Sequence, residues 1–215
     1  MQCQKTSIEN STKLSEIKLL IFDLDGVLID SKENMRYSWS YVKKKYGLKF
    51  KFDNFFNNIG LKFEDILNKL NIKNYQTSLQ KAYSRASIYY FYKIKLYKGV
   101  KNIINYLRKN YYIAVLTSKD NLRTKKILKK FNLKFHYIYC PVKGKKGKPN
   151  PWQINNLLKK LKLKKKNAVY IGDTSHDKKT ASNAKVKFIY AKYGYGNLKN
   201  EKYFINKPKD LFKYI

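Results

Sequence analysis

Two acidic side chains directly follow a short apolar run near the start of the chain. Residues 19–22 have the composition of a fully buried strand, and Asp23 and Asp25 come where this run ends. Burying two carboxylates at such a position costs free energy unless they bind a cation or take part in chemistry. This stretch by itself could also be a strand followed by an ordinary acidic turn. The residues at other strand ends are needed to distinguish a functional site from such a turn.

Further polar side chains follow other apolar runs, namely Thr117, Ser118, Lys148, Asp173 and Asp177. If these runs are neighbouring parallel strands, the polar groups meet at the carboxyl edge of the sheet, where open α/β sheets bind ligands. Carboxylate oxygens suit Mg²⁺, and hydroxyl, backbone N–H and ammonium groups suit a phosphate. Taken singly, Thr117 could cap a strand and Asp177 could be a surface acid in a first helical turn. Together they predict a metal and phosphate site.

The order of elements after residue 98 is that of an α/β protein. Apolar runs typical of strands occur at 112–116, 135–139, 168–171 and 188–191, and amphipathic segments typical of helices lie between them. With the run at 19–22, this alternation predicts a doubly wound parallel sheet. We expect residues 17–31 and 98–215 to form this Rossmann-like core.

The segment between the two parts of the core has a helical pattern. Apolar residues recur at spacings of three and four over 35–46, 63–70 and 77–92. Ser31 can serve as the N-cap of the first helix, and Gly47 ends it. Nothing from 32 to 97 resembles a buried parallel strand, so we expect an all-helical cap over residues 32–97, inserted into the core.

Length and cysteine content limit the class of protein. A chain of 215 residues, 43% of them hydrophobic, can bury a full core. Cys3 and Cys140 are too few for a disulfide framework or a zinc site, which favours a reducing compartment, and we expect a cytoplasmic protein. No apolar stretch approaches the length of a membrane span, so no membrane partner is expected. Residues 1–16 are polar, and we expect a flexible N-terminal extension there.

Charge is the most unusual global feature. Lys and Arg outnumber Asp and Glu by 48 to 14, which gives a formal net charge of +34. A nucleic-acid partner would account for this excess. However, the lysines occur in every segment instead of one stripe, and arginine, the usual reader of bases, is scarce. We favour a surface composition set by biased coding, and in either case the field attracts anionic substrates.

Four motifs in order carry a family resemblance. They are Asp23-Leu-Asp25-Gly26-Val-Leu-Ile-Asp30-Ser31, Val115-Leu-Thr117-Ser118, Gly147-Lys148-Pro149-Asn-Pro151 and Ile171-Gly172-Asp173-Thr174-Ser-His-Asp177. With them the sequence resembles the haloacid dehalogenase (HAD) superfamily, in the branch of phosphoglycolate-phosphatase-like and β-phosphoglucomutase-like hydrolases with a small helical cap. The resemblance runs from about residue 18 to the C-terminal region and includes Tyr193-Gly194-Tyr195-Gly196.

The resemblance implies a catalytic pair. Asp23 would be the nucleophile that takes the phosphoryl group as an aspartyl-phosphate. Asp25 would protonate the leaving oxygen and then deprotonate the attacking water.

The resemblance also implies the groups that hold metal and phosphate. Mg²⁺ would be bound by Asp173, Asp23 and the carbonyl of Asp25. Thr117, Ser118 and Lys148 would bind the substrate phosphate, with Asp177 and Gly172 in support. A cation is needed because an anionic nucleophile approaches an anionic phosphate.

Residue differences separate the branches of this superfamily. Haloacid dehalogenases and phosphonatases lack the second acid, so Asp25 argues against both. β-Phosphoglucomutases carry a cap histidine where this chain has Met35, and a cap arginine where it has the loop Ile59–Phe63. We therefore expect a Mg²⁺-dependent phosphatase that acts on a small phosphorylated metabolite.

Two other functions stay open from the sequence. One is a β-phosphoglucomutase-like phosphoryl transferase, and the other is a basic nucleic-acid-associated protein on the same scaffold. The identity of the phosphate ester is open as well. Three basic residues of the predicted cap could contact an anionic leaving group, although each also suits a solvated surface position: Arg36, Lys62 and Arg85.

Overall fold

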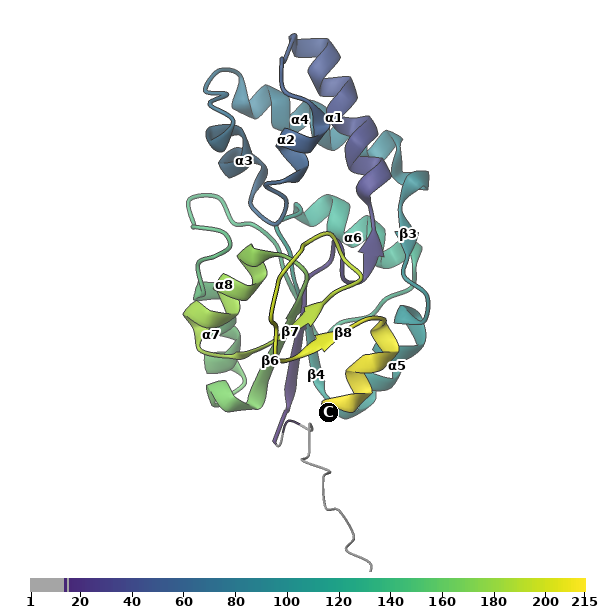
Figure 1. Ribbon diagram of the computed structural model, residues 1–215, viewed down its shortest axis with the longest axis vertical. Helices are drawn as coiled ribbons and strands as arrows, with labels where there is room; N and C mark the ends of the chain where they lie inside the picture. The colour runs from purple at the N-terminus through teal and green to yellow at the C-terminus, as the bar shows by residue number, and fades with distance from the viewer. Residues whose placement is uncertain (1–13, 15) are drawn as a thin grey trace, which may run out of the picture.

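Six strands form a parallel sheet, in the order β5-β4-β1-β6-β7-β8, in the computed structural model (Figure 1). The structure describes residue 14 and residues 16–215. The strands are β1 (Leu19–Phe22), β4 (Tyr112–Leu116), β5 (Tyr137–Tyr139), β6 (Ala168–Gly172), β7 (Lys187–Ala191) and β8 (Phe204–Ile205). All the pairings are parallel, and β1 lies between β4 and β6. The predicted α/β fold with a parallel sheet is confirmed.

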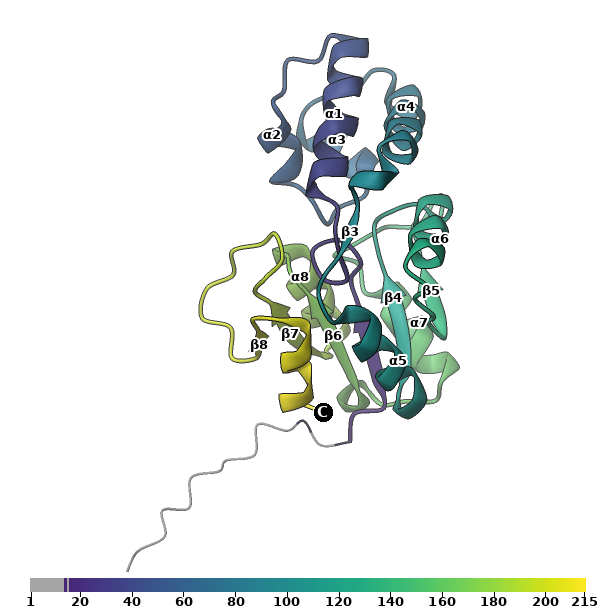
Figure 2. The same cartoon turned by 90° about the vertical axis from the view of Figure 1, so that its right-hand side faces the viewer.

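Helices cover both faces of this sheet (Figure 2). They are α5 (Val100–Asn110), α6 (Asn121–Lys130), α7 (Trp152–Lys160), α8 (Ser175–Ala184) and the 3-10 helices η2 (Lys165–Asn167) and η3 (Pro208–Lys213). On β1, Leu20 and Phe22 belong to the apolar cluster that includes α5, α6 and η3. Leu19 and Ile21 belong to the cluster that includes α7 and α8. Burial on both faces explains why this strand is apolar at every position.

The segment predicted to be the cap lies beyond the carboxyl ends of the strands (Figures 1 and 2). Its helices are α1 (Lys32–Tyr46), α2 (Phe52–Phe56), α3 (Phe63–Lys69), α4 (Gln76–Tyr89) and the 3-10 helix η1 (Phe91–Lys93). The chain enters and leaves the cap through β2 (Ile29–Asp30) and β3 (Lys95–Leu96), which pair in antiparallel fashion. This small ribbon is the double connection between core and cap.

The apolar pattern did not predict the shortest elements. Helix α2 and strands β2, β3 and β8 have five residues or fewer, too few to repeat a period. The strand expected over 135–139 begins only at Tyr137 and is partly exposed, because β5 is an edge strand. Gly47 ends α1 with φ 64°, as predicted. Ser31 occupies the N-cap of α1, but its side chain makes no capping hydrogen bond within the described structure.

The N-terminal extension expected over residues 1–16 lies mostly outside the described residues. Within it, Leu14 is buried, and its N–H donates to the carbonyl of Tyr214 at 2.7 Å. Among the described residues, none of the helices combines the length and the apolar character that crossing a bilayer requires.

Aromatic side chains form the centre of the cap. Trp39 of α1 is 1% exposed and stacks on Phe55 of α2, with ring centroids 4.6 Å apart. Phe55 also packs against Tyr83 of α4, at 5.4 Å, and against Phe63 of α3, at 6.0 Å. A helix as short as α2 is not stable by itself, so this packing holds it in place.

Replacing the central cap tryptophan should destabilise the cap strongly. Trp39→Ala removes a fully buried ring and leaves a cavity, which costs about 3–5 kcal/mol. Urea unfolding followed by far-UV circular dichroism measures the loss. Tyr41→Ala on the same helix is the control, because Tyr41 is 43% exposed and should change stability by less than about 1 kcal/mol. Equal effects of the two substitutions would contradict a cap core centred on Trp39.

Candidate active site

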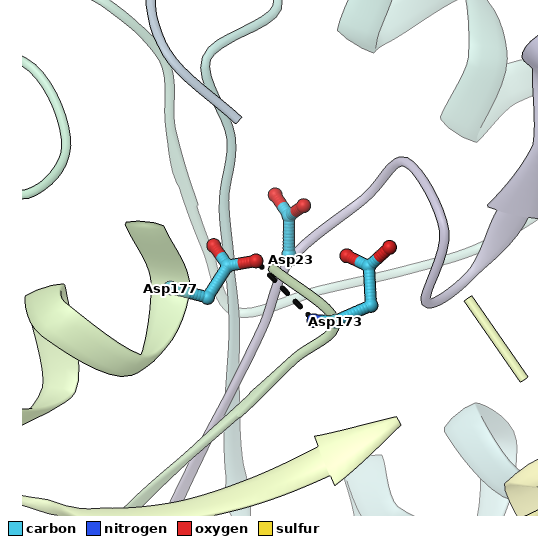
Figure 3. A group of neighbouring side chains, drawn as sticks. All are labelled: Asp23, Asp173 and Asp177. Atoms are coloured by element: carbon cyan, nitrogen blue, oxygen red, sulfur yellow. Dashed lines mark hydrogen bonds between the residues drawn. The ribbon is translucent and has the colours of Figure 1, made fainter. Parts of the chain in front are cut away.

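Two carboxylates lie side by side where neighbouring strands end. Strands β1 and β6 pair with Phe22 opposite Ile171, and the N–H of Asp23 donates to the carbonyl of Ile171 at 2.9 Å. Asp173 follows the end of β6, and Asp177 lies in the first turn of α8. Figure 3 shows the three carboxylates together, and one oxygen of each lies within 4.8 Å of the others. The parallel sheet thus brings together acids that are 150 residues apart in the chain.

Lys148 lies inside this acidic cluster. Its side chain is buried, and Nζ is 2.7 Å from Asp23 Oδ1 and 2.7 Å from Asp177 Oδ1. The second oxygen of Asp177 accepts hydrogen bonds from the Thr174 N–H (3.0 Å) and hydroxyl (2.7 Å). Tyr170 donates its hydroxyl to Asp177 Oδ1 at 2.8 Å. Both oxygens of Asp177 are therefore occupied by protein groups, and this residue orients Lys148.

The carboxylate of Asp173 has fewer hydrogen-bond partners than that of Asp177. Its Oδ2 accepts the Tyr195 N–H at 2.7 Å, but its buried Oδ1 has no hydrogen-bond partner among the described residues. Burial, together with the nearby carboxylates of Asp177 and Asp23, raises the pKa of Asp173 well above its usual value. A hard cation between Asp23 and Asp173 would fill the place of the missing partner, and carboxylate oxygens are the ligands that Mg²⁺ prefers.

The pKa values of the other groups in the cluster reflect burial and neighbouring charges together. Burial raises the pKa of Asp23 to about 7; Lys148 opposes this rise, and the carboxylates of Asp177 and Asp25 add to it. Burial alone would also raise the pKa of Asp177, but its bonds to Lys148 and Thr174 lower it overall. Burial acts to lower the pKa of Lys148, yet Asp177 and Asp23 raise it. Full ionisation of the three carboxylates would exceed the single positive charge of Lys148, which favours binding of a further cation.

Gly172 makes room for this arrangement. A Cβ atom at this position would lie 2.3 Å from the Cβ of Asp177. Any other residue would therefore push α8 away from β6 and move Asp177 from Lys148. This contact gives Gly172 a supporting position in the cluster.

Asp25 points toward a cavity between core and cap. The cavity has a volume of about 50 Å³, and Asp23, Asp25 and Thr117 are among its lining residues. Asp25 Oδ1 accepts the hydroxyl of Ser31 and pairs with Lys119 Nζ at 3.1 Å. The two acids of the first motif therefore have different partners, Lys148 for Asp23, and Ser31 and Lys119 for Asp25.

The hydroxyl groups after β4 lie at the same cavity. Thr117 Oγ1 accepts the N–H of Lys119 at 3.1 Å. Ser118 also lines the cavity, but its hydroxyl donates to the carbonyl of Gly60 in the cap at 2.6 Å. The side chain of Ser118 thus joins the cap loop to the core. Because its hydroxyl proton is used in this bond, the predicted phosphate contact of Ser118 falls to its backbone N–H.

Sequence reasoning missed two buried cations of this cavity. Lys119 and Arg123 are 6% and 7% exposed and both line it, whereas the described surroundings of the cavity do not include Arg36, Lys62 or Arg85. Arg123 Nε is 2.5 Å from Asp120 Oδ2, and its guanidinium lies over the ring of Tyr83. Lys119 could have been recognised by its place in the sequence, because it follows Ser118 at the end of the same strand. It was not, because lysines are abundant throughout the chain.

Comparison with known proteins places the chain in a family. The family model described as haloacid dehalogenase-like hydrolase matches residues 20–191, a span that contains the four motifs and the cap. The chain belongs to the haloacid dehalogenase-like hydrolases. The resemblance read from the motifs is thereby confirmed.

Curated relatives of this HAD-like hydrolase are phosphatases by name. Phosphoglycolate phosphatase of Aquifex aeolicus is 27% identical over 208 residues, which cover 92% of this chain and 96% of the relative. Pyrophosphatase PpaX of Halalkalibacterium halodurans is 28% identical over 186 residues, with 83% and 85% covered.

Solved structures agree on the fold. A haloacid dehalogenase-like family hydrolase from Streptococcus pneumoniae has a TM-score of 0.80 at 20% identity, covering 92% of this chain and 97% of that one. A hydrolase from Pseudomonas syringae has a TM-score of 0.81 at 21% identity, with 91% and 96% covered. Core and cap together match these folds over most of their length.

Mg²⁺ should stabilise this HAD-like hydrolase through Asp173. A cation at one hundred times its dissociation constant adds about 2.7 kcal/mol to the free energy of unfolding, which a thermal melt detects. Asp173→Asn should abolish the increase in Tm on adding Mg²⁺, while the metal-free variant melts at or above the wild-type temperature because the cost of burying this carboxyl group, which raises its pKa, is gone. Asp53→Asn, at an exposed cap position, is the control and should respond like wild type. An undiminished Mg²⁺ response in Asp173→Asn would refute the site.

Proposed function

We propose that this hydrolase is a Mg²⁺-dependent phosphatase that hydrolyses a small phosphomonoester through an aspartyl-phosphate on Asp23. The observation that carries the proposal is the buried cluster in which Asp23 contacts Lys148 beside an unpartnered oxygen of Asp173. Asp25 lies at the adjoining cavity, as an acid and base must. The names of the curated relatives, phosphoglycolate phosphatase and pyrophosphatase, support the same class of reaction.

The first half-reaction transfers the phosphoryl group to the protein. A carboxylate oxygen of Asp23 attacks the phosphorus, and the bond from phosphorus to the leaving oxygen breaks. Asp25 donates a proton to that oxygen, so the alcohol departs neutral. Lys148, 2.7 Å from Asp23, offsets the charge on the phosphoryl oxygens.

The second half-reaction releases phosphate. Water attacks the phosphorus of the aspartyl-phosphate, Asp25 takes a proton from that water, and the bond between phosphorus and Asp23 breaks. Inorganic phosphate leaves, and Asp23 is again a free carboxylate. Thr117 and the backbone N–H of Ser118 bind the phosphoryl oxygens in both halves in this proposal, because the Ser118 hydroxyl donates to the carbonyl of Gly60.

Asp23, Asp173 and the carbonyl of Asp25 are the proposed ligands of Mg²⁺. The ion would supply positive charge that lowers the repulsion between Asp23 and the substrate phosphate.

Hydrolysis is favoured over phosphoryl transfer between two sites of one sugar. The cap residues that line the cavity are uncharged among the described residues: Met35, Phe55, Ile59, Gly60, Leu61, Phe63, Ile66 and Tyr83. A mutase has to hold a second phosphate against the cap, and the apolar cap side of the cavity gives that phosphate no partner. The cations that line the cavity, Lys119 and Arg123, come from the core and pair with Asp25 and Asp120. A small neutral or singly charged leaving group fits this surface better.

The cell compartment is part of the proposal. Among the described residues Cys140 forms no disulfide, which suits the reducing cytoplasm expected from the cysteine content.

Wild-type protein should release phosphate from 4-nitrophenyl phosphate and from members of a phosphate-ester panel beginning with 2-phosphoglycolate, only with Mg²⁺. Asp23→Asn should abolish turnover, because the amide cannot accept the phosphoryl group. Asp25→Asn should lower the rate about 10²–10⁴-fold, the usual contribution of acid–base catalysis. Rapid quench and peptide mass spectrometry should find one phosphoryl group on the peptide that contains Asp23.

Thermal melts of both variants serve as the folding control for these rates. Absence of turnover by folded wild-type protein on the whole panel would overturn the proposal. If that protein also bound nucleic acid with a steep salt dependence, the binding alternative would replace it.

A further inference from the structure

The loop after β7 connects the acidic cluster to the entrance of the cap. It contains the motif Tyr193-Gly194-Tyr195-Gly196, which has no role in the proposed reaction steps. Tyr195 contacts Asp173 on one side and the β2–α1 junction on the other. The inference drawn from these contacts rests on the proposed phosphatase reaction.

The backbone of this loop lies directly against Asp173. The N–H of Tyr195 donates to Asp173 Oδ2 at 2.7 Å, so the other oxygen stays available for a cation. A Cβ atom on Gly194 would lie 2.4 Å from the Cβ of Asp173 and 2.5 Å from the carbonyl of Gly26. Only glycine permits this approach, which places the Tyr195 side chain toward the cap.

The side chain of Tyr195 holds the start of α1. Its hydroxyl accepts the Ser31 N–H at 2.6 Å and donates to Asp30 Oδ1 at 3.1 Å. Its ring packs on Phe56 of the cap, with centroids 5.1 Å apart. The Ser31 hydroxyl oxygen also lies 3.4 Å from the Tyr195 hydroxyl oxygen.

Ser31 connects Tyr195 to Asp25 through two hydrogen bonds. The amide of Ser31 is one of the unpaired N–H groups at a helix start, and Tyr195 satisfies it. The Ser31 hydroxyl is not used to cap α1 within the described structure, and it donates to Asp25 Oδ1 instead. Ser31 is fully buried, so water does not compete for either bond.

We propose that Tyr195 is a positioning residue for proton donation, which acts through Ser31 to aim the Asp25 carboxyl at the leaving oxygen. Lys119 pairs with the same oxygen, Asp25 Oδ1, so Ser31 and Lys119 together fix one carboxyl oxygen. The other oxygen is left for the substrate. Loss of the tyrosine hydroxyl frees the Ser31 amide and lets the Ser31 hydroxyl turn back to cap the helix.

The leaving group distinguishes this role from a structural one. Nitrophenolate departs readily as an anion, whereas an alkoxide has to be protonated as it leaves. Tyr195→Phe keeps the backbone bond to Asp173 and the ring contact with Phe56, and it removes only the hydroxyl. For this variant we expect kcat/KM to fall about tenfold with the alkyl phosphate that wild type hydrolyses fastest. With 4-nitrophenyl phosphate we expect a decrease below about twofold.

Ser31→Ala should reproduce this leaving-group pattern. Tyr190→Phe is the matched control, because the Tyr190 hydroxyl donates to the carbonyl of Gly196 in the same loop, at 2.6 Å, without reaching Ser31. Its effect should be the same for both substrates. An equal decrease with both substrates in Tyr195→Phe would overturn the proposal and leave Tyr195 a structural residue.

Two measurements test the same contacts without turnover. Amide hydrogen exchange of the peptide that contains Ser31 should be about tenfold faster in Tyr195→Phe and unchanged in Tyr190→Phe. The Mg²⁺ concentration that gives half the Tm increase should stay within about twofold of wild type, since the Tyr195 N–H remains. Unchanged exchange at Ser31 refutes the positioning contact, whereas wild-type inactivity on the ester panel refutes only the proposed reaction.

Discussion

The site depends on three buried carboxyl groups that share one ammonium group, that of Lys148. Lys148 contacts Asp23 and Asp177, whereas Asp173 Oδ1 has no hydrogen-bond partner among the described residues. Removing unbalanced charges from water costs several kcal/mol for each ion. The carboxyl groups are held at the centre of the fold, by the ends of the inner strands β1 and β6 and the first turn of α8. Such an arrangement favours binding of a cation, and a phosphate can then fill the remaining coordination positions of that cation.

The cap changes the medium in which these charges act. Its lining of the cavity is apolar, and it meets the core through the Ser118–Gly60 bond and through Lys62, whose ammonium donates to the carbonyl of Lys145. Excluding water strengthens the attraction between Lys148 and anionic groups, because the local dielectric constant falls. The positive charge of the chain and the buried carboxyl groups thus serve different steps. The many lysines attract anionic substrates, and the buried acids take part in the reaction of those substrates.

Much of the fold followed from local pattern. Strand β1 was recognisable because burial on both faces leaves only apolar residues, and the α/β alternation after residue 98 predicted the other central strands. Short elements such as α2 and β8 were not predicted, because their stability comes from contacts such as the Phe55 packing and not from their own sequence. The candidate site was predictable to the extent that its residues stand at strand ends. Lys119 was missed since type alone does not distinguish it from the other lysines.

The sequence by itself determined which chemical groups stand at the ends of the central strands, since hydrophobic burial dictates where each strand stops. Only the tertiary structure decided how those groups share partners. It assigned Asp177 to Lys148, left one oxygen of Asp173 unpaired, and joined Tyr195 to Ser31 across 164 residues of chain. Hydrogen bonds between distant segments depend on which loops lie side by side in the folded protein. The hydrophobic periodicity along the chain predicts local helices and strands and does not predict these neighbours.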